Sequence, residues 1–395
     1  MKQTVKDLTD LKGTTVFVRV DYNVPIEKGA ITDETRIRAS LPTLAHLFKA
    51  GARVVLASHL GRPKKGPAPE FSLKPVAARL SEMTGRAVAM APDCVGPEVK
   101  TMAAAVREGG ALMLENVRFH PEEEKNDPSF AARLIADTGA TVFVNDAFGS
   151  AHRAHASTEG VSHHVKVSVA GLLMERELKY LGMALEAPAR PYVAILGGAK
   201  VSDKIQVIDN LLTRVDSLLI GGGMAYTFFR AKGLATAKSL VEQDKVDLAR
   251  GLLDKGKGKI HLPVDHVVAS EMAEGAQRQS LPVEQIPDGW MGLDIGPITA
   301  GVFGQAIRKA ALAVWNGPMG VFEVKPFAEG TLAVARAMAD SKGTTIVGGG
   351  DSVAAVTQMG LADRISHVST GGGASLEFLS GEPLPGVACL KDAPG

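Results

Sequence analysis

The chain has 395 residues, a length that favours two domains over one, and 45% of its residues are hydrophobic. Its 44 basic and 43 acidic side chains nearly cancel, which argues against general binding to nucleic acid or to an anionic membrane surface. Two distant cysteines, a polar N-terminus and the lack of a membrane-length apolar stretch predict a cytoplasmic protein that engages no membrane.

Short apolar runs alternate with amphipathic segments along the chain. The runs predict strands at 14–21, 52–59, 111–118 and 140–147 in the first half, and at 191–198, 217–224, 259–266, 312–319, 344–351 and 367–374 in the second. Near-continuous Val, Ile, Leu and Ala are typical of strands buried on both faces of a parallel sheet. The pattern predicts an α/β fold with two doubly wound domains, each a mainly parallel sheet flanked by helices.

Helical spacing connects these strands. Apolar residues recur on one face after Asp33, and again after Ser202, where Ser202 and Asp203 are predicted N-terminal caps. The domain boundaries follow from this pattern, because residues 171–188 read as a linking helix between domains at 1–170 and 189–378. The segment after about Ser380 is too rich in Gly and Pro for a predicted helix.

Polar side chains stand where the strands of the first half end. They include Asp21, Asn23, His59, Arg62, Arg118, His120, Asp146, His152, Arg153 and His155, and Arg36 and Arg38 open a helix nearby. Ligands of open α/β sheets bind beyond the carboxyl ends of the strands, and arginine matches carboxylate and phosphate oxygens. The first half is therefore expected to bind a small polyanion, although any single arginine is more often a solvated surface residue.

Two other features of the first half point elsewhere. The histidine pairs 152/155 and 163/164 lack the cysteine or carboxylate of a familiar metal site, so no metal is expected there. Residues 120–127, "HPEEEKND", are predicted to form an exposed acidic loop.

Glycine turns follow the strands of the second half. Runs of three consecutive glycines occur at 221–223, at 348–350 and at 371–373. A fourth turn, with Gly197 and Gly198, precedes Lys200 and Lys204. Glycine lets the backbone approach a ligand, and the opening N–H groups of a helix favour an anion. Four such turns predict a nucleotide site, with both lysines at the start of one helix. Asp351 is either an N-terminal cap or a ligand of Mg²⁺.

Together these motifs resemble those of the phosphoglycerate kinase family over almost the whole chain. The matching stretches include "VDYNVP", "SHLGRP", "LENVRFHPEEEKND", "NDAFGSAHRAHAS", "ILGGAKVSDKI", "WNGPMGVFE", "GGGDSVAA" and "STGGGASLEFLSG". Ser352 stands where the family often has Thr, a change that keeps the hydroxyl.

The resemblance implies reversible phosphoryl transfer between ATP and the carboxylate of 3-phosphoglycerate, which gives 1,3-bisphosphoglycerate and ADP. It implies a monomer with a hinge, Mg²⁺ as cofactor, and a C-terminal segment at 379–395 that returns to the first domain. The implied phosphoglycerate ligands are Asp21, Asn23, Arg36, His59, Arg62, Arg118 and Arg153. The implied nucleotide ligands are Lys204, Gly221, Gly222, Asn316, Glu323, Gly349, Gly350, Asp351 and Ser352, with Asp351 toward the metal. Arg36, Lys200, Gly350 and Gly373 would surround the transferring group.

Two alternatives remain at this stage. An NAD-dependent dehydrogenase also has two α/β domains, but it needs GxGxxG after a strand, and none of the GGG turns continues in that way. A non-catalytic anion-binding module with a hinge would not need the nucleotide-type turns together with Lys200 and Lys204.

Overall fold

In the computed structural model, which describes residues 1–64 and 66–394, the chain divides into two units. The first unit comprises residues 1–179 and 383–395, and the second comprises residues 180–382. Across the described residues, no helix is both long and apolar enough to cross a membrane.

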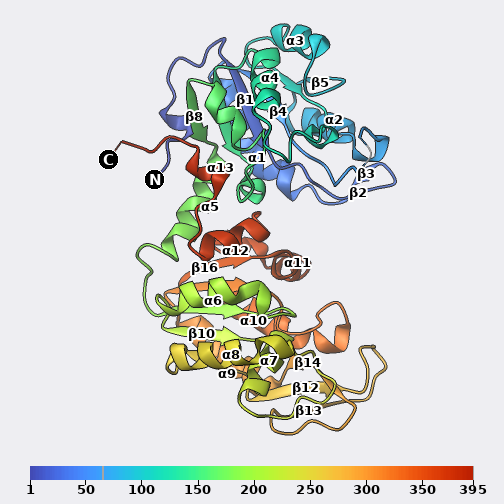
Figure 1. The fold of residues 1–395 in the computed structure, drawn as a ribbon, viewed down its shortest axis with the longest axis vertical. Coiled ribbons are helices and arrows are strands. Elements are labelled where there is room, and N and C mark those ends of the chain that lie inside the picture. The colour runs from blue at the N-terminus through green and yellow to red at the C-terminus, as the bar shows by residue number, and fades with distance from the viewer. Residues whose placement is uncertain (65, 395) are drawn as a thin grey trace. The chain divides into compact units, whose positions relative to one another are not determined.

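The first unit is built on a six-stranded parallel sheet in the order β5-β6-β4-β1-β7-β8 (Figure 1). The strands are β1 (Thr15–Val20), β4 (Arg53–Ala57), β5 (Val88–Met90), β6 (Ala111–Met113), β7 (Val142–Asp146) and β8 (Val167–Ala170), and β2 (Ile26–Glu27) and β3 (Ala30–Ile31) form a hairpin. The helices are α1 (Thr35–Lys49), α2 (Lys74–Thr84), α3 (Pro97–Ala104), α4 (Pro128–Thr138) and α13 (Pro385–Ala388), and α5 (Leu172–Met183) begins in this unit and ends in the second.

Strand β1 shows why these runs are apolar without alternation. Val16 and Val18 belong to the same core as Ile37 of α1, on one face of the sheet. Phe17 lies between them in sequence, so its side chain points to the opposite face, where it contacts Phe143 of β7 with ring centroids 6.2 Å apart. Both faces are therefore buried, as the near-continuous apolar pattern predicts.

The second unit contains a parallel sheet in the order β11-β10-β9-β15-β16-β17 and a separate antiparallel sheet in the order β13-β12-β14. The strands are β9 (Tyr192–Leu196), β10 (Ser217–Ile220), β11 (Ile260–His261), β12 (Asp265–Ala269), β13 (Arg278–Pro282), β14 (Met291–Ile295), β15 (Leu312–Asn316), β16 (Thr344–Gly348) and β17 (His367–Val368). The helices are α6 (Ile205–Leu212), α7 (Met224–Ala231), α8 (Val246–Gly256), α9 (Pro297–Lys309), α10 (Glu329–Asp340), α11 (Gly350–Gln358) and α12 (Gly373–Leu379).

The α/β fold with two mainly parallel sheets is confirmed, but the single strand predicted at 259–266 is wrong. That run is divided at Pro263: β11 joins the parallel sheet, and β12 begins the antiparallel one. Proline has no N–H to donate to a ladder, so the run cannot continue as one central strand.

The expectation that no helix follows Ser380 is also wrong. Pro385 opens the short helix α13, a position where its missing N–H costs nothing. This segment packs within the first unit, where Asn145 Nδ2 donates to the carbonyl of Gly386 over 2.8 Å. Lys2 Nζ lies 2.9 Å from Asp392 Oδ1 at the end of the same segment.

Candidate functional site

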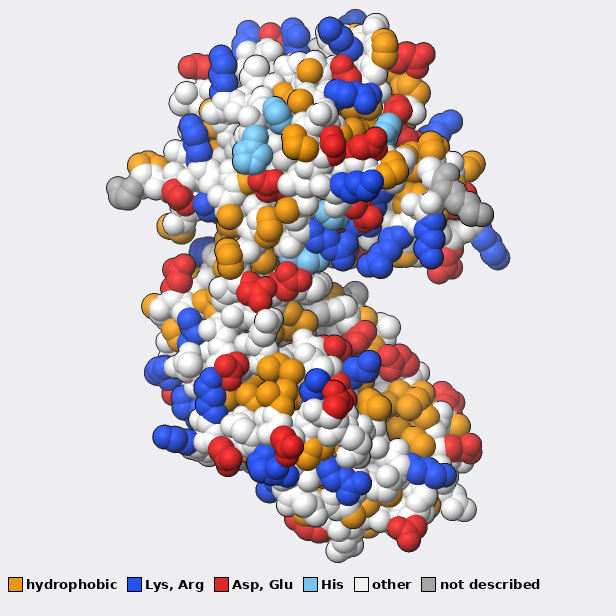
Figure 2. Space-filling model, in the orientation of Figure 1, with side chains coloured by type: hydrophobic (Ala, Val, Ile, Leu, Met, Phe, Trp, Pro, Cys, Tyr) orange, Lys and Arg blue, Asp and Glu red, His pale blue; other side chains and the backbone are white. Residues whose placement is uncertain are grey.

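The polar residues of the first half reach one edge of its sheet. Neighbouring strands β6, β4, β1 and β7 run parallel, so their carboxyl ends lie together. Asp21 and Asn23 follow β1, and His59 and Arg62 follow β4. Arg118 lies in the 3₁₀ helix η3 (Val117–Phe119) after β6, and Arg153 follows β7. Figure 2 shows Lys, Arg and His side chains gathered along this edge.

Three of these residues, Arg62, Arg118 and Arg153, line a cavity of about 650 Å³ in the first unit. Its lining consists of Arg62, Pro63, Lys64, Arg118, Glu124, Arg153 and His155. Three arginines and a lysine face a single carboxylate, so the cavity carries an excess of positive charge. Such a lining favours a small anion with several oxygens.

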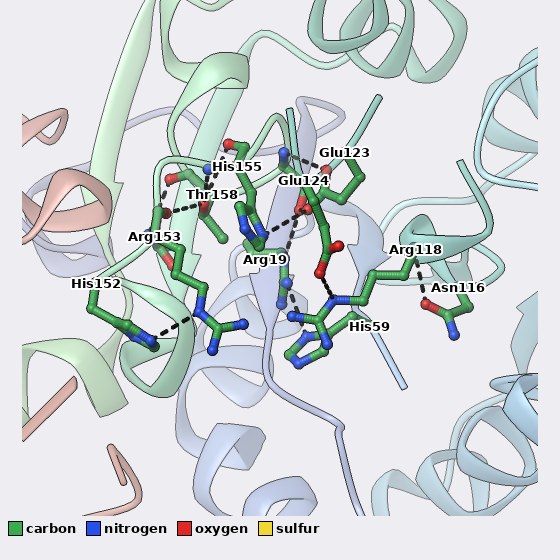
Figure 3. Close-up of polar contacts among 12 residues, drawn as sticks. Arg19, His59, Asn116, Arg118, Glu123, Glu124, His152, Arg153, His155 and Thr158 are labelled. Atoms are coloured by element: carbon green, nitrogen blue, oxygen red, sulfur yellow. Dashed lines mark hydrogen bonds and ion pairs between the residues drawn. The ribbon is translucent and has the colours of Figure 1, made fainter. Parts of the chain in front are cut away.

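Hydrogen bonds and an ion pair to other protein groups hold two of the cavity arginines, Arg118 and Arg153, in place. Arg118 Nη1 donates to the carbonyl of Gly61 over 2.8 Å, and its Nε lies 3.2 Å from Glu124 Oε1. Arg153 Nε donates to His152 Nε2 over 3.0 Å (Figure 3). Burial lowers the pKa of Arg118, a cost that an anionic ligand in the cavity would offset.

Arg36, Asp21 and Asn23 form a second group on the same edge. Arg36 Nη1 lies 2.8 Å from Asp21 Oδ1, and Asp21 Oδ1 also accepts from the backbone N–H of Asn23. The Asn23 side chain accepts from the backbone N–H of Gly61 over 2.8 Å. Arg36 is partly exposed and pre-positioned by Asp21, so it can turn one face of its guanidinium to a ligand.

The sequence reasoning missed Arg19, which lies on β1 and is 1% exposed. Its Nε donates to Ser157 Oγ over 2.8 Å, and its Nη2 lies 3.1 Å from His59 Nδ1 (Figure 3). A guanidinium has no acceptor, so His59 Nδ1 must accept and the ring proton must lie on Nε2. Burial, followed by the charge of Arg19, holds the pKa of His59 well below its ordinary value. His59 is therefore a neutral donor among cations.

The charge of Arg19 is balanced by Glu123, so the prediction of an exposed acidic loop at 120–127 is wrong at this residue, although Glu122 and Glu124 on either side are exposed. Glu123 is fully buried, and its carboxylate accepts from Ser157 Oγ over 2.6 Å and from the Ser157 backbone N–H over 2.9 Å. Burial raises the pKa of Glu123, whereas Arg19 and the two bonds lower it. Glu124, next in sequence, does line the cavity.

Two of the predicted strand-end residues, Asp146 and His120, and Arg38 of the nearby helix α1 serve other purposes. Asp146 is buried and accepts from the backbone N–H groups of Leu173 and Met174 at the start of α5, and burial raises its pKa to about 6. His120 lies 2.7 Å from Asp93, and Arg38 pairs with Glu34 at 2.7 Å. None of the three is among the residues that line the cavity.

The glycine turns of the second unit pack against one another. The N–H of Gly198 donates to the carbonyl of Pro318, and the N–H of Gly222 donates to that of Met319. A Cβ on Gly222, where φ is +68°, would lie 2.6 Å from the backbone N of Gly198. Carbonyls of the unit therefore occupy the backbone N–H groups of Gly221 and Gly222. Gly221 bonds to Leu196.

The turn before α11 differs, because it leaves a helix N-terminus open. Gly349 is the N-cap with φ +87° and provides no capping side chain, so the first N–H groups of α11 keep their capacity for an anion. Gly350 and Asp351 in this first turn are exposed. Ser352 is buried, and its Oγ accepts from the N–H of Gly317 over 2.7 Å, which fixes the neighbouring loop.

Lys204 and Asn316 lie beside this turn. Lys204 is 7% exposed and its Nζ donates to Asn316 Oδ1, while Asn316 Nδ2 has no hydrogen-bond partner among the described residues. A Cβ on Gly349 would approach that Nδ2 to 2.9 Å, so only glycine leaves the amide open beside the turn. Burial lowers the pKa of Lys204 to about 8, although Asp203 and Asp351 raise it. Lys204 thus places a buried ammonium group beside the Asn316 Nδ2 donor, which is free to bind a ligand.

The remaining predicted residues of this half are placed less tightly. Lys200, Glu323 and Gly373 are exposed, and Gly373 opens α12. Lys200 precedes the 3₁₀ helix η6 (Ser202–Lys204), so the expected pairing of two lysines on one helix start is wrong. The expected capping role is wrong too, because Ser202 Oγ donates to Glu242 and α6 begins after Lys204.

Over almost its whole length, the chain is similar in sequence and in structure to known phosphoglycerate kinases. The sequence model of the family described as phosphoglycerate kinase matches residues 5–382. The phosphoglycerate kinase of Solibacter usitatus (strain Ellin6076) is 60% identical over 392 residues, 98% of each chain. The cytosolic phosphoglycerate kinase of Triticum aestivum is 58% identical over 391 residues, 97% of each chain. A solved structure of phosphoglycerate kinase from Coxiella burnetii matches with a TM-score of 0.89 and 41% identity, and the match covers 98% of both chains.

Proposed function

The chain belongs to the phosphoglycerate kinase family, and we propose that its first unit binds 3-phosphoglycerate and its second unit binds ATP. The reaction is reversible phosphoryl transfer between ATP and the carboxylate of 3-phosphoglycerate, a step of glycolysis and gluconeogenesis. The protein is thus a phosphotransferase with a carboxyl acceptor, and no comparison supports a dehydrogenase.

The observation that carries the assignment of the acceptor site is the cationic cavity of the first unit. Arg62, Arg118 and Arg153 line it together, and 3-phosphoglycerate offers a phosphate and a carboxylate to match them. His59 would add an uncharged Nε2–H donor, oriented by Arg19. Asp21 and Asn23 would contact the hydroxyl-bearing end of the substrate and hold Arg36 in place.

Phosphoryl transfer to a carboxylate requires that the substrates are positioned and their charge is neutralised, but it requires no general acid or base. The acceptor carboxylate is already an anion at neutral pH, so no proton has to leave it before attack. Transfer passes through a state with charge spread over the phosphoryl oxygens. Arg36, Lys200 and the N–H groups at Gly350 and Gly373 are the proposed donors to those oxygens.

The nucleotide would bind at the turn before α11. Its phosphates would accept from the open N-terminus of that helix, from Lys204 and from Asn316 Nδ2. Gly221 and Gly222 would shape the wall of this site through their close backbone packing rather than through free N–H groups. Glu323 is exposed and would accept from the ribose hydroxyls.

The donor set also fits Mg²⁺. Asp351 presents an exposed carboxylate in the first turn of α11, next to the proposed phosphate site. Mg²⁺ prefers such hard oxygen ligands, usually one or two carboxylates together with substrate phosphates. Bound there, the ion would neutralise charge on the phosphates, and Asp351 would orient it.

We propose further that the protein acts as a cytoplasmic monomer, and that a hinge about the segment 171–188 brings the two ligands together. The transfer needs the acceptor and the donor within bonding distance, and exclusion of water protects the phosphoryl group from hydrolysis. The domains would be 1–170 and 189–378, with 379–395 as an extension of the first.

Paired variants test the division of the sites. Arg153→Met should raise the Kd for 3-phosphoglycerate by about 10-fold or more and leave the Kd for ATP within about twofold, whereas Lys204→Met should do the reverse. Titration calorimetry with each ligand separately measures both effects. If either variant weakened both ligands equally, the proposed assignment of one ligand to each unit would be wrong.

A further inference from the structure

A second cluster of metal-ligating side chains lies on the first unit, outside the cavity. It consists of Asp93 and Cys94, in the loop between β5 and α3, and His120, directly after η3. Each residue offers one ligand atom, and these atoms all lie within 4.8 Å of one another. We propose that this Asp93–Cys94–His120 cluster is a binding site for a thiophilic divalent cation of the Zn²⁺ class.

The ligand atoms of the three side chains already lie close together. Asp93 Oδ1 accepts from His120 Nε2 over 2.7 Å and from the backbone N–H of Cys94 over 2.6 Å. The His120 ring stacks on Phe130 of α4, with centroids 5.1 Å apart and an interplanar angle of 27°, which fixes the direction of Nε2. Little reorganisation separates this arrangement from a coordinated one, because the ligands are oriented before the ion arrives.

The identity of the donors selects the ion. A thiolate, an imidazole and a carboxylate form the mixed S, N and O set that Zn²⁺ takes, whereas Mg²⁺ and Ca²⁺ prefer oxygen alone. A thiolate and a carboxylate together would neutralise the two charges of the ion. Binding replaces the thiol proton, which leaves to solvent, and coordination through His120 Nε2 places the ring proton of the neutral imidazole on Nδ1, without any redox step.

The burial pattern leaves an approach for the ion and room for a fourth ligand. The Cys94 side chain is buried, but the side chain of Asp93 is 46% exposed and that of His120 is 25% exposed. An ion held by these three residues would therefore face solvent on one side and complete its tetrahedron with water. Burial raises the pKa of the Cys94 thiol, so the metal-free cluster holds a protonated, inert thiol.

The site would connect two parts of the first unit that are distant in sequence. An ion there ties the loop before α3 to the segment between η3 and α4, and His120 lies two residues after Arg118. A ligand that binds the folded chain raises its thermal stability by mass action. This consequence does not depend on the proposed kinase activity, so it can be tested on its own.

Cobalt(II) titration followed by absorbance provides the most direct test, because Co²⁺ replaces Zn²⁺ in such sites and its bonds to thiolate absorb strongly. The reduced, full-length protein should develop a thiolate–Co²⁺ band at one equivalent, and Zn²⁺ should displace the ion and raise the unfolding temperature. Cys94→Ser should abolish the band and weaken Zn²⁺ binding by roughly 100-fold or more. Cys389→Ser, which removes the other thiol, is the matched control and should keep the band.

His120→Asn guards against a folding defect at the buried position 94. This side chain is partly exposed, so the variant should fold, retain the thiol, and still lose Zn²⁺ binding and the gain in unfolding temperature. The proposal is overturned if the wild-type chain shows no Cys94-dependent band, or if His120→Asn binds Zn²⁺ as tightly as the wild-type chain.

Discussion

Lys204→Met should separate stability from nucleotide binding, because Lys204 combines burial with charge. The side chain is 7% exposed, and burial lowers its pKa from 10.5 to about 8 in the folded chain. A pKa shift of that size means that folding destabilises the protonated amine, relative to the neutral amine, by about 3 kcal/mol. The wild-type chain therefore holds, at its proposed phosphate site, a cation whose remaining desolvation cost a bound anionic ligand would offset.

The sign of the pH dependence follows from the two protonation states. Below about pH 8 the amine is protonated in both the folded and the unfolded chain, so the folded state carries the full penalty. Between about pH 8 and 10.5 the unfolded chain binds more protons, so this group makes the wild-type protein more stable as the pH rises. Methionine removes this dependence entirely.

Urea unfolding of both proteins at pH 7 and pH 10 measures the effect. The free energy of unfolding of Lys204→Met minus that of the wild type should be about 2–3 kcal/mol larger at pH 7 than at pH 10, because only the wild-type chain buries a charge at pH 7. The bond to Asn316 is charge-assisted at pH 7 and weaker for the neutral amine at pH 10, and the folded-state pKa already includes this difference, so the comparison needs no separate correction. At pH 7, kcat/KM for ATP should fall about 10–150-fold, the loss of one charge-assisted hydrogen bond.

Lys200→Met is the matched control, because that lysine is exposed and loses little hydration on folding. Its difference from the wild type should change by less than about 0.5 kcal/mol over the same pH interval. The reasoning about Lys204 is refuted if the stability difference for Lys204→Met is equally independent of pH.

Four further predictions concern individual residues of the two sites. Nitrogen-15 NMR of the His59 ring should show one neutral tautomer, protonated on Nε2, from pH 5.5 to 8; titration near 6.5 would contradict the role of its buried arginine partner. Arg36→Ala should lower kcat by about 100-fold or more while the Kd for ATP stays within twofold, and an unchanged kcat would exclude its place at the transferring group. Asp351→Asn should raise the free Mg²⁺ concentration at half-maximal rate by about 10-fold, measured at constant ATP; an unchanged value would place the ion elsewhere. Gly349→Ala should weaken ATP binding in calorimetry, because its φ of +87° and the 2.9 Å approach to Asn316 leave no room for a Cβ; wild-type affinity would show that the turn can relax.

The parts of the structure that the sequence predicts best are those that follow from parallel strands. A polar residue directly after a buried apolar run must lie at the carboxyl edge of the sheet, and this reasoning placed Arg62, Arg118 and Arg153 correctly around one cavity. It overreached at Asp146, because a carboxylate at a strand end serves equally well to bind the first N–H groups of the next helix.

What the sequence did not reveal depends on which side chains become buried. Arg19 occupies an interior position of an apolar strand, and Glu123 lies within a run of acidic residues, so neither pattern predicts that they share one buried network. Lys200 and Lys204 look equivalent by spacing, yet one is exposed and the other is buried against Asn316. The polar strand β13 lacks alternation because most of its residues are exposed, so the antiparallel sheet was not predicted.

Trapping of the product with hydroxylamine tests the central claim most directly, because acyl phosphates form hydroxamates and phosphate esters do not. With ATP, Mg²⁺ and 3-phosphoglycerate, the protein should produce the hydroxamate of the acceptor in step with ADP, and neither product should form without the acceptor. Formation of ADP at the same rate without 3-phosphoglycerate, or with no hydroxamate, would contradict transfer to the carboxylate.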